Sequence, residues 1–211
     1  MSAAPRTGSD DHAWARRVTD VAELLAWSAA NQAPTLGSTR LVCVDGHAGS
    51  GKSTLGRALL DAAHEFGTAR LLHVDDLLEG WTGLASLSER VERDLVGPLR
   101  RGEPGRYQRY DWEHGRFAEW HTVDPVDTLV LEGVGSGAAA YADAVTLLVW
   151  VEAPRDLRLR RGMARDGEAM RPQWLAWMED EQALFSRERT RARADAIVDG
   201  TGEGDRALMF V

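Results

Sequence analysis

Apolar residues occur along this chain in two patterns, short continuous runs and helical spacing, and the two patterns alternate. Continuous apolar runs are typical of strands that are buried on both faces of a parallel sheet. They predict strands at 41–44, 69–74, 128–131, 144–151 and 196–198. Helical spacing predicts helices over 18–30, 52–66, 86–99, 154–165 and 172–190. Strands that alternate with helices in this way predict an α/β fold, a three-layer, doubly wound parallel sheet.

Two segments lack this periodicity. Residues 1–12 are small, polar and acidic, so we expect a tail there and a single domain over 13–211. Residues 102–127 are expected to form a long excursion over the sheet. Because long loops on a rigid scaffold often carry function, this excursion is a candidate for substrate contact.

Composition narrows the classes of protein that the chain can belong to. A length of 211 residues suits one domain, and the formal charge of −8 disfavours a nucleic-acid partner. The single cysteine, Cys43, cannot form an internal disulfide and is expected to be a small buried side chain. No apolar stretch approaches the ~20 residues that span a bilayer, and no signal pattern opens the chain. We therefore expect a cytoplasmic protein without a membrane partner; a homodimer is left open.

The most specific motif lies between the strand at 41–44 and the helix at 52–66. It matches G-x-x-x-x-G-K-[ST] in full, in the residues Gly46, His47, Ala48, Gly49, Ser50, Gly51, Lys52 and Ser53, with Thr54 next in the chain. Glycines let successive backbone N–H groups point inward, and the N-terminus of the following helix adds partial positive charge. Lys52 is expected to reach the β- and γ-phosphates of a nucleoside triphosphate, and the Ser53 hydroxyl to bind Mg²⁺. The segment Gly46 to Thr54 therefore predicts a P-loop NTPase fold with ATP and Mg²⁺ as cofactors.

Carboxylates follow two other predicted strands. Glu132 ends the run Leu129-Val130-Leu131 and is our candidate for completing the metal shell; the alternative is a cap on the next segment. Asp75 and Asp76 follow the strand at 69–74, where the carboxyl ends of parallel strands line a ligand crevice. One of them could accept the proton of an acceptor hydroxyl, and either could cap a short helix.

Arginines are concentrated in the helix at 154–165. Arg158, Arg161 and Arg165 stand three and four residues apart, so they share one face. We interpret residues 158–171 as a helical lid whose Arg161 and Arg165 stabilise the transferring phosphoryl group, with bends at Gly162 and Gly167. The alternative is a solvated helix paired with acidic neighbours.

A helical stripe in the last long helix has the pattern of core packing, and we assign it no chemistry. Its members are Trp174, Trp177, Met178, Glu181, Leu184 and Phe185.

Taken together, these segments resemble the uridine kinase branch of P-loop kinases. The likeness is carried by the phosphate loop, by His73-Val74-Asp75-Asp76, by Tyr110-Asp111-Trp112-Glu113-His114 and by Leu129-Val130-Leu131-Glu132-Gly133. The resemblance implies that Asp75 is the base and that the segment with Tyr110, Trp112 and His114 contacts a nucleoside-like acceptor. We expect the acceptor site to consist of Asp75, Asp76, Trp81, Tyr110, Trp112 and His114. The stretch Leu77-Leu78-Glu79-Gly80-Trp81 differs from the Phe-Tyr that follows the aspartates in the family.

The sequence therefore predicts an ATP-dependent kinase that phosphorylates a hydroxyl of a small molecule. A nucleoside monophosphate kinase is one alternative, for which Arg101, Arg106 and Arg109 could bind the second phosphate. A nucleotide-binding regulator or ATPase that transfers phosphate only to water is the other.

Overall fold

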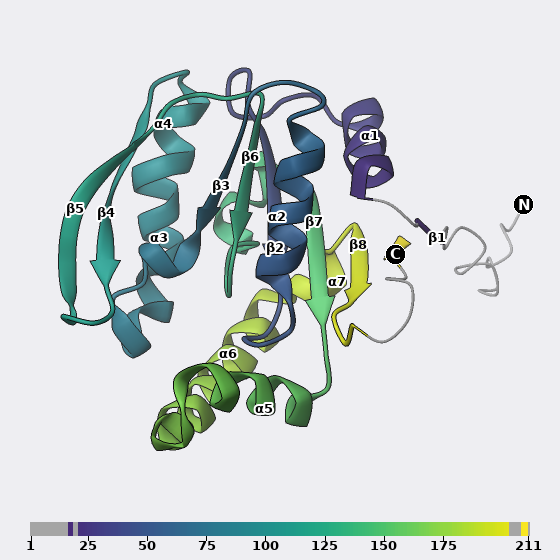
Figure 1. Ribbon diagram of the computed structural model, residues 1–211. Helices are drawn as coiled ribbons and strands as arrows, with labels where there is room; N and C mark the ends of the chain where they lie inside the picture. The colour runs from purple at the N-terminus through teal and green to yellow at the C-terminus, as the bar shows by residue number, and fades with distance from the viewer. Residues whose placement is uncertain (1–16, 19–20, 203–207, 211) are drawn as a thin grey trace, which may run out of the picture.

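The computed structural model of the chain describes residues 17–18, 21–202 and 208–210, and the predicted tail at 1–12 lies outside them. Seven strands form one sheet in the order β1-β9-β8-β7-β2-β6-β3. Figure 1 shows its central strands β3, β6, β2, β7 and β8 side by side. Their bounds are Arg17–Val18 (β1), Arg40–Asp45 (β2), Ala69–His73 (β3), Thr128–Glu132 (β6), Val145–Glu152 (β7), Ala196–Asp199 (β8) and Leu208–Phe210 (β9). Strands β3, β6, β2, β7 and β8 are parallel to one another, and β9 and β1 add antiparallel strands at one edge. The predicted doubly wound α/β fold is confirmed.

The helices are α1 (Val21–Asn31), α2 (Lys52–Ala63), α3 (Leu87–Val91), α4 (Gly97–Arg100), α5 (Arg155–Asp166), α6 (Arg171–Glu188) and α7 (Thr190–Arg193). A π-helical stretch, Glu92–Val96, joins α3 to α4, so the helix predicted over 86–99 is one continuous helical segment. Among the helices of the described residues, none is both long and apolar enough to cross a membrane.

The central strands alternate their side chains between two separate apolar cores, as period-2 strands must. Val42 and Val44 of β2 pack on one face with residues of α1 and α2, including Leu24 and Leu59. The opposite face is covered by the α3–α4 segment, by α6 and by the excursion over the sheet. This arrangement gives the three predicted layers and buries Cys43 completely.

The excursion at 102–127 is more regular than the sequence indicates. It contains an antiparallel hairpin of β4 (Gly105–Asp111) and β5 (Arg116–Val123), which pair only with each other. Most of the hairpin's side chains are not fully buried, and Tyr107 and Val123 are its buried hydrophobic anchors. With so few buried positions, the sequence lacks the alternation that predicts strands.

Some predicted boundaries need correction, and one strand was not predicted. Val18 lies in β1 and pairs with Leu208, so the first helix begins at Val21. Helix α2 ends at Ala63, because the N–H groups of Glu65 and Phe66 bond three residues back and tighten the chain into turns. The strand at 196–198 is followed by β9, which the sequence analysis missed.

The carboxyl ends of the parallel strands bring the candidate functional residues to one edge of the sheet. Strand β2 lies between β6 and β7; the crossover from β2 to β3 runs toward one edge of the sheet, and the crossover from β6 to β7 runs toward the other. In doubly wound sheets such a switch point is where ligands bind. The phosphate loop follows β2 at this position, and Glu132 ends the neighbouring strand β6.

Candidate active site

The phosphate loop connects β2 to α2 and depends on glycines for its path. Gly46, Gly49 and Gly51 have φ values of 142°, 77° and 105°, which favour glycine. A Cβ on Gly46 would lie 2.2 Å from the carbonyl oxygen of Val151, and one on Gly49 would lie 2.7 Å from that of Arg158. No other residue fits at Gly46 and Gly49 without moving the backbone.

Lys52 begins α2 and is nearly buried, with 6% of its surface exposed. Its Nζ donates a hydrogen bond of 3.0 Å to the carbonyl oxygen of His47. An ammonium group has three donors, so two remain for phosphate oxygens in the cavity that Lys52 lines.

Ser53, Glu132 and His73 form a chain of polar contacts beside Lys52. The Ser53 hydroxyl donates to Oε1 of Glu132 over 3.2 Å, and Nδ1 of His73 lies 2.5 Å from Oε2. The hydrogen bond with Glu132 raises the pKa of His73. Serine and carboxylate oxygens are the ligand types that Mg²⁺ prefers, so the donor set fits a hard divalent cation. Within the described part of the chain, no group of three or more His, Cys, Asp or Glu side chains is arranged so that it could hold a metal ion.

Asp45, the last residue of β2, anchors the loop from behind. Its side chain is fully buried and accepts hydrogen bonds from the backbone N–H groups of Gly46, Gly135 and Gly137 at 2.7 to 2.9 Å. Burial raises the pKa of Asp45 to about 6, and the three backbone N–H groups oppose this rise. The carboxylate thus joins the phosphate loop to the segment after β6.

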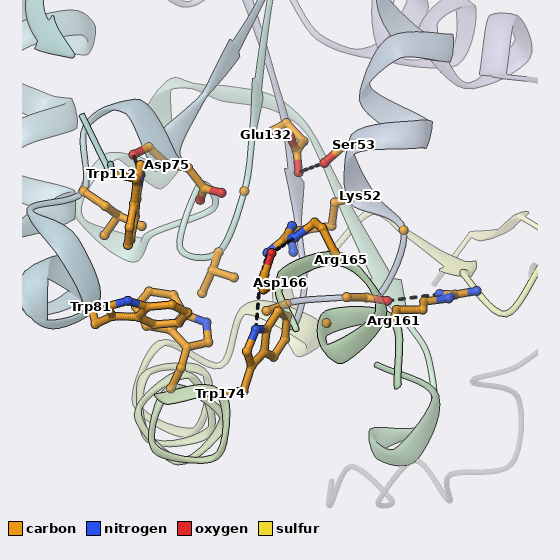
Figure 2. A pocket seen from close by; sticks show the side chains of 18 of the residues that line it. Lys52, Ser53, Asp75, Trp81, Trp112, Glu132, Arg161, Arg165, Asp166 and Trp174 are labelled. Atoms are coloured by element: carbon orange, nitrogen blue, oxygen red, sulfur yellow. Dashed lines mark hydrogen bonds and ion pairs between the residues drawn. The ribbon is translucent and has the colours of Figure 1, made fainter. Parts of the chain in front are cut away.

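A cavity of about 740 Å³ opens in front of the loop. Figure 2 shows Lys52 and Ser53 on one side and Asp75, Trp81 and Trp112 on the other. The remaining lining includes Asp76, Leu78, Val134, Arg161, Arg165, Asp166, Met170, Trp174 and Trp177. One cavity therefore joins the predicted phosphate site to most of the predicted acceptor site.

The end of the cavity away from the loop is acidic and aromatic. Asp75 opens onto the cavity, yet protein surrounds it on its other sides, and this burial raises the pKa of its carboxyl, against the charge of Lys52. The indole N–H of Trp112 donates to the carbonyl oxygen of Asp75 at 3.1 Å. Trp81 packs edge-on against both Trp112 and Trp177, at centroid distances of 5.7 and 5.8 Å. These contacts make a continuous indole wall beside the Asp75 carboxylate.

Two predicted acceptor residues do not line this cavity. Tyr110 packs behind Trp112 and against Phe117, at centroid distances of 5.5 and 5.2 Å. His114 lies at the exposed turn of the hairpin and pairs with Asp111 at 3.0 Å. Tyr110 thus contacts Trp112 of the indole wall without lining the cavity, and His114 lies away from the cavity.

The three arginines of α5 have three different environments. Arg158 is buried against Glu181, with an Nη1 to Oε1 distance of 2.7 Å. Arg161 donates to the carbonyl oxygens of Gly49 and Gly200 at 3.0 and 2.8 Å. Arg165 pairs with Asp166 and lies on the cavity wall.

Helix α5 is continuous through Gly162, which is therefore not a bend. A Cβ there would lie 2.5 Å from the indole of Trp174, so this glycine permits α5 and α6 to pack closely. Gly167 ends the helix with φ 90° and does change the chain direction.

Several residues that contact the site or line its cavity were not predicted from the sequence. Asp45 and His73 are the last residues of β2 and β3, next to predicted site residues, but the sequence analysis assigns neither of them a role. Trp174 and Trp177 are buried, as the stripe predicts, but they also line the cavity. Glu181 carries a signal that the sequence analysis did not use. A charged residue at a core position of a helix needs a buried partner, so Glu181 indicates a buried polar contact of this helix.

Comparison with known proteins agrees with this geometry. No family model matches the chain. The uridine kinase of Latilactobacillus sakei subsp. sakei (strain 23K) is 28% identical over 192 residues, covering 80% of this chain and 89% of that protein. The uridine kinase of Leuconostoc citreum (strain KM20) is 29% identical over 186 residues, with 77% and 88% covered. A solved structure described as a possible uridine kinase from Bacillus stearothermophilus superposes with a TM-score of 0.59 at 19% identity, covering 84% of this chain and 96% of that one.

The fold and the phosphate loop define a P-loop kinase. Within that class the chain is similar to uridine kinases, and it is a phosphotransferase with an alcohol group as acceptor.

Proposed function

We propose that this kinase transfers the γ-phosphoryl group of ATP to a hydroxyl of an uncharged, nucleoside-like small molecule. The observation that carries the proposal is the single cavity that contains Lys52 and Ser53 at one end and Asp75 with the indole wall at the other. Phosphoryl transfer consists mainly of positioning and charge stabilisation, so donor and acceptor must share one enclosed space.

The nucleotide end of the site is assigned from the loop outward. Backbone N–H groups of the phosphate loop, among them those of Gly51, Lys52 and Ser53, would hold the phosphates, and the Lys52 side chain would contact the β- and γ-phosphates. A second cavity of about 310 Å³ adjoins the loop and is lined by Gly51, Thr54, Arg161 and Gly200, which suits the nucleoside part of ATP. Ser53 and Glu132 would hold Mg²⁺, which supplies charge neutralisation on the phosphate oxygens.

Asp75 would act as the base. Its carboxylate is exposed to the cavity, and desolvation by the surrounding protein raises its pKa above the ordinary value of 3.8. A carboxylate with a raised pKa is a stronger base and therefore a better proton acceptor, and it can still ionise. Asp75 would orient the acceptor hydroxyl and take its proton. Arg161 and Arg165 would stabilise the charge that develops on the transferred group.

The acceptor end favours a neutral compound over a nucleoside monophosphate. A monophosphate kinase needs a cation there, but Arg101, Arg106 and Arg109 do not line the cavity. Arg101 and Arg109 pair with Glu103 and Glu119 instead. Indoles beside a carboxylate suit a flat ring that carries a hydroxyl.

A mass-spectrometric screen tests this function. Nucleosides, nucleoside monophosphates, sugars and aminoglycosides are each incubated with enzyme, ATP and Mg²⁺. A gain of one phosphoryl group on a nucleoside or a related neutral ring compound is the expected result. Phosphorylation of monophosphates alone would favour the monophosphate kinase, and ATP loss without any phosphorylated acceptor would favour the ATPase.

A further inference from the structure

One peptide group of the phosphate loop is held at both of its polar ends. The carbonyl oxygen of His47 accepts from Nζ of Lys52 at 3.0 Å. The N–H of the same peptide group, that of Ala48, donates to Oε2 of Glu181 at 2.7 Å. Because a trans peptide is planar and its C=O and N–H point in opposite directions, whatever fixes the N–H also fixes the carbonyl.

Glu181 is itself fixed by a buried partner. Its side chain is fully buried on α6, and Nη1 of Arg158 on α5 donates to Oε1 at 2.7 Å. Arg158 is 6% exposed, and its Nε donates to the carbonyl oxygen of Ala153 at 3.1 Å. Its Nη1 also lies 3.4 Å from the carbonyl oxygen of Ala48. Each of the two carboxylate oxygens therefore has a defined donor.

Stability alone gives little reason for this arrangement. Burying a carboxylate and a guanidinium costs solvation energy that their attraction only partly offsets, and apolar residues of similar size often serve equally well. A buried ion pair that also holds the backbone of a ligand-binding loop can instead fix the orientation of that backbone.

We propose that Glu181 and Arg158 are positioning residues for Lys52. By holding the His47–Ala48 peptide group, they keep its carbonyl directed at the Lys52 ammonium, which is thereby placed for the triphosphate. Without the pair, the Ala48 N–H is free to turn into the cavity, and the carbonyl then releases Lys52. The inference rests on the proposed function, in which Lys52 contacts the β- and γ-phosphates.

The test replaces the whole pair, since removing one partner would leave a buried charge. The double variant Arg158→Met/Glu181→Met is compared with the wild type by calorimetric titration with Mg²⁺ and a non-hydrolysable ATP analogue, and with Mg²⁺ and ADP. We expect the variant to fold and its affinity for the ATP analogue to fall by about tenfold or more, a larger loss than for ADP.

The matched control is Arg155→Met/Glu179→Met, which removes an exposed ion pair between the same two helices. Its nucleotide affinities should equal those of the wild type. A folded Arg158→Met/Glu181→Met variant with wild-type affinity for the ATP analogue would overturn the inference, because a purely structural pair is replaceable by apolar side chains.

Amide hydrogen exchange of the wild type gives a second test that depends neither on variant folding nor on nucleotide. The Ala48 N–H should be strongly protected in the free protein, and rapid exchange there would contradict the inference. If the wild type itself takes up neither nucleotide while Ala48 is protected, the proposed function fails but the held peptide group does not.

Discussion

The hydroxyl oxygen of Ser53 lies 3.2 Å from Oε1 of Glu132, although 79 residues separate the two in the chain. The fold produces this contact by placing β6 beside β2, so that the end of β6 faces the start of α2. A hydroxyl and a carboxylate at this separation can share one cation, because each retains free lone pairs.

Glu132→Gln should therefore weaken the dependence of ATP binding on magnesium. We expect the Mg²⁺ concentration needed for half-maximal ATP binding to rise by about tenfold or more. Titration of Mg²⁺ at fixed ATP measures this, and Glu152→Gln, which removes another carboxylate from a strand end, is the control. An unchanged magnesium requirement in Glu132→Gln would remove Glu132 from the metal site.

Asp75→Asn should separate nucleotide binding from phosphoryl transfer. The variant keeps the size of the side chain but cannot accept a proton, so transfer should fall by about 10²- to 10⁴-fold while ATP affinity remains. Asp76→Asn is the informative comparison, since Asp76 shares the cavity and accepts from the Tyr107 hydroxyl at 3.4 Å. A larger loss in Asp76→Asn than in Asp75→Asn would move the base role to Asp76.

Trp112→Ala should raise KM for the acceptor. The substitution removes one indole of the cavity wall and the hydrogen bond to the Asp75 carbonyl, at a cost of about tenfold in KM. ATP affinity should not change, because Trp112 lies at the opposite end of the cavity from the loop (Figure 2). Trp120→Ala, on the same hairpin but packed against Arg106, is the control and should leave both constants unchanged. Equal effects of the two substitutions would contradict the assignment of the acceptor end.

The contribution of Asp45 to the free energy of unfolding should decrease as the pH rises. Its pKa is about 6 in the folded protein against 3.8 without burial, so the folded state binds more protons between these values. Its contribution is fully present below about pH 4 and is lost as pH rises through 6, a change of about 3 kcal/mol. Denaturant unfolding of the wild type and Asp45→Asn between pH 4 and 7 measures it. The stability of the wild type relative to the variant should fall over this range, and a constant or rising difference would show that Asp45 is not so perturbed.

The sequence predicts most of the elements that position the site. Strands β2, β6, β7 and β8 are marked by apolar runs because they are buried, and the edge strand β3 has a shorter apolar run in which only Leu72 is buried. The phosphate loop is marked by glycines that its path requires. The β4–β5 hairpin could not be predicted in the same way, because its two strands pair only with each other and few of their side chains are fully buried.

Some of the site residues could likewise be predicted from the sequence, and others could not. Lys52, Ser53, Glu132 and Asp75 stand at loop and strand ends, which topology alone brings to one edge. The partners of Arg158 and Arg161 could not be deduced, because their spacing on a helix says nothing of what packs against it. Both contact carbonyl oxygens of the phosphate loop, which precedes them by more than 100 residues in the chain.

The most direct test of the central claim is calorimetric titration of ATP into the wild type and into Lys52→Ala, each with and without Mg²⁺. The wild type should bind ATP in a magnesium-dependent manner, with a dissociation constant between about 1 μM and 1 mM, and Lys52→Ala should bind it at least about tenfold more weakly. Absence of magnesium-dependent ATP binding in the wild type, or equal binding by Lys52→Ala, would contradict the account.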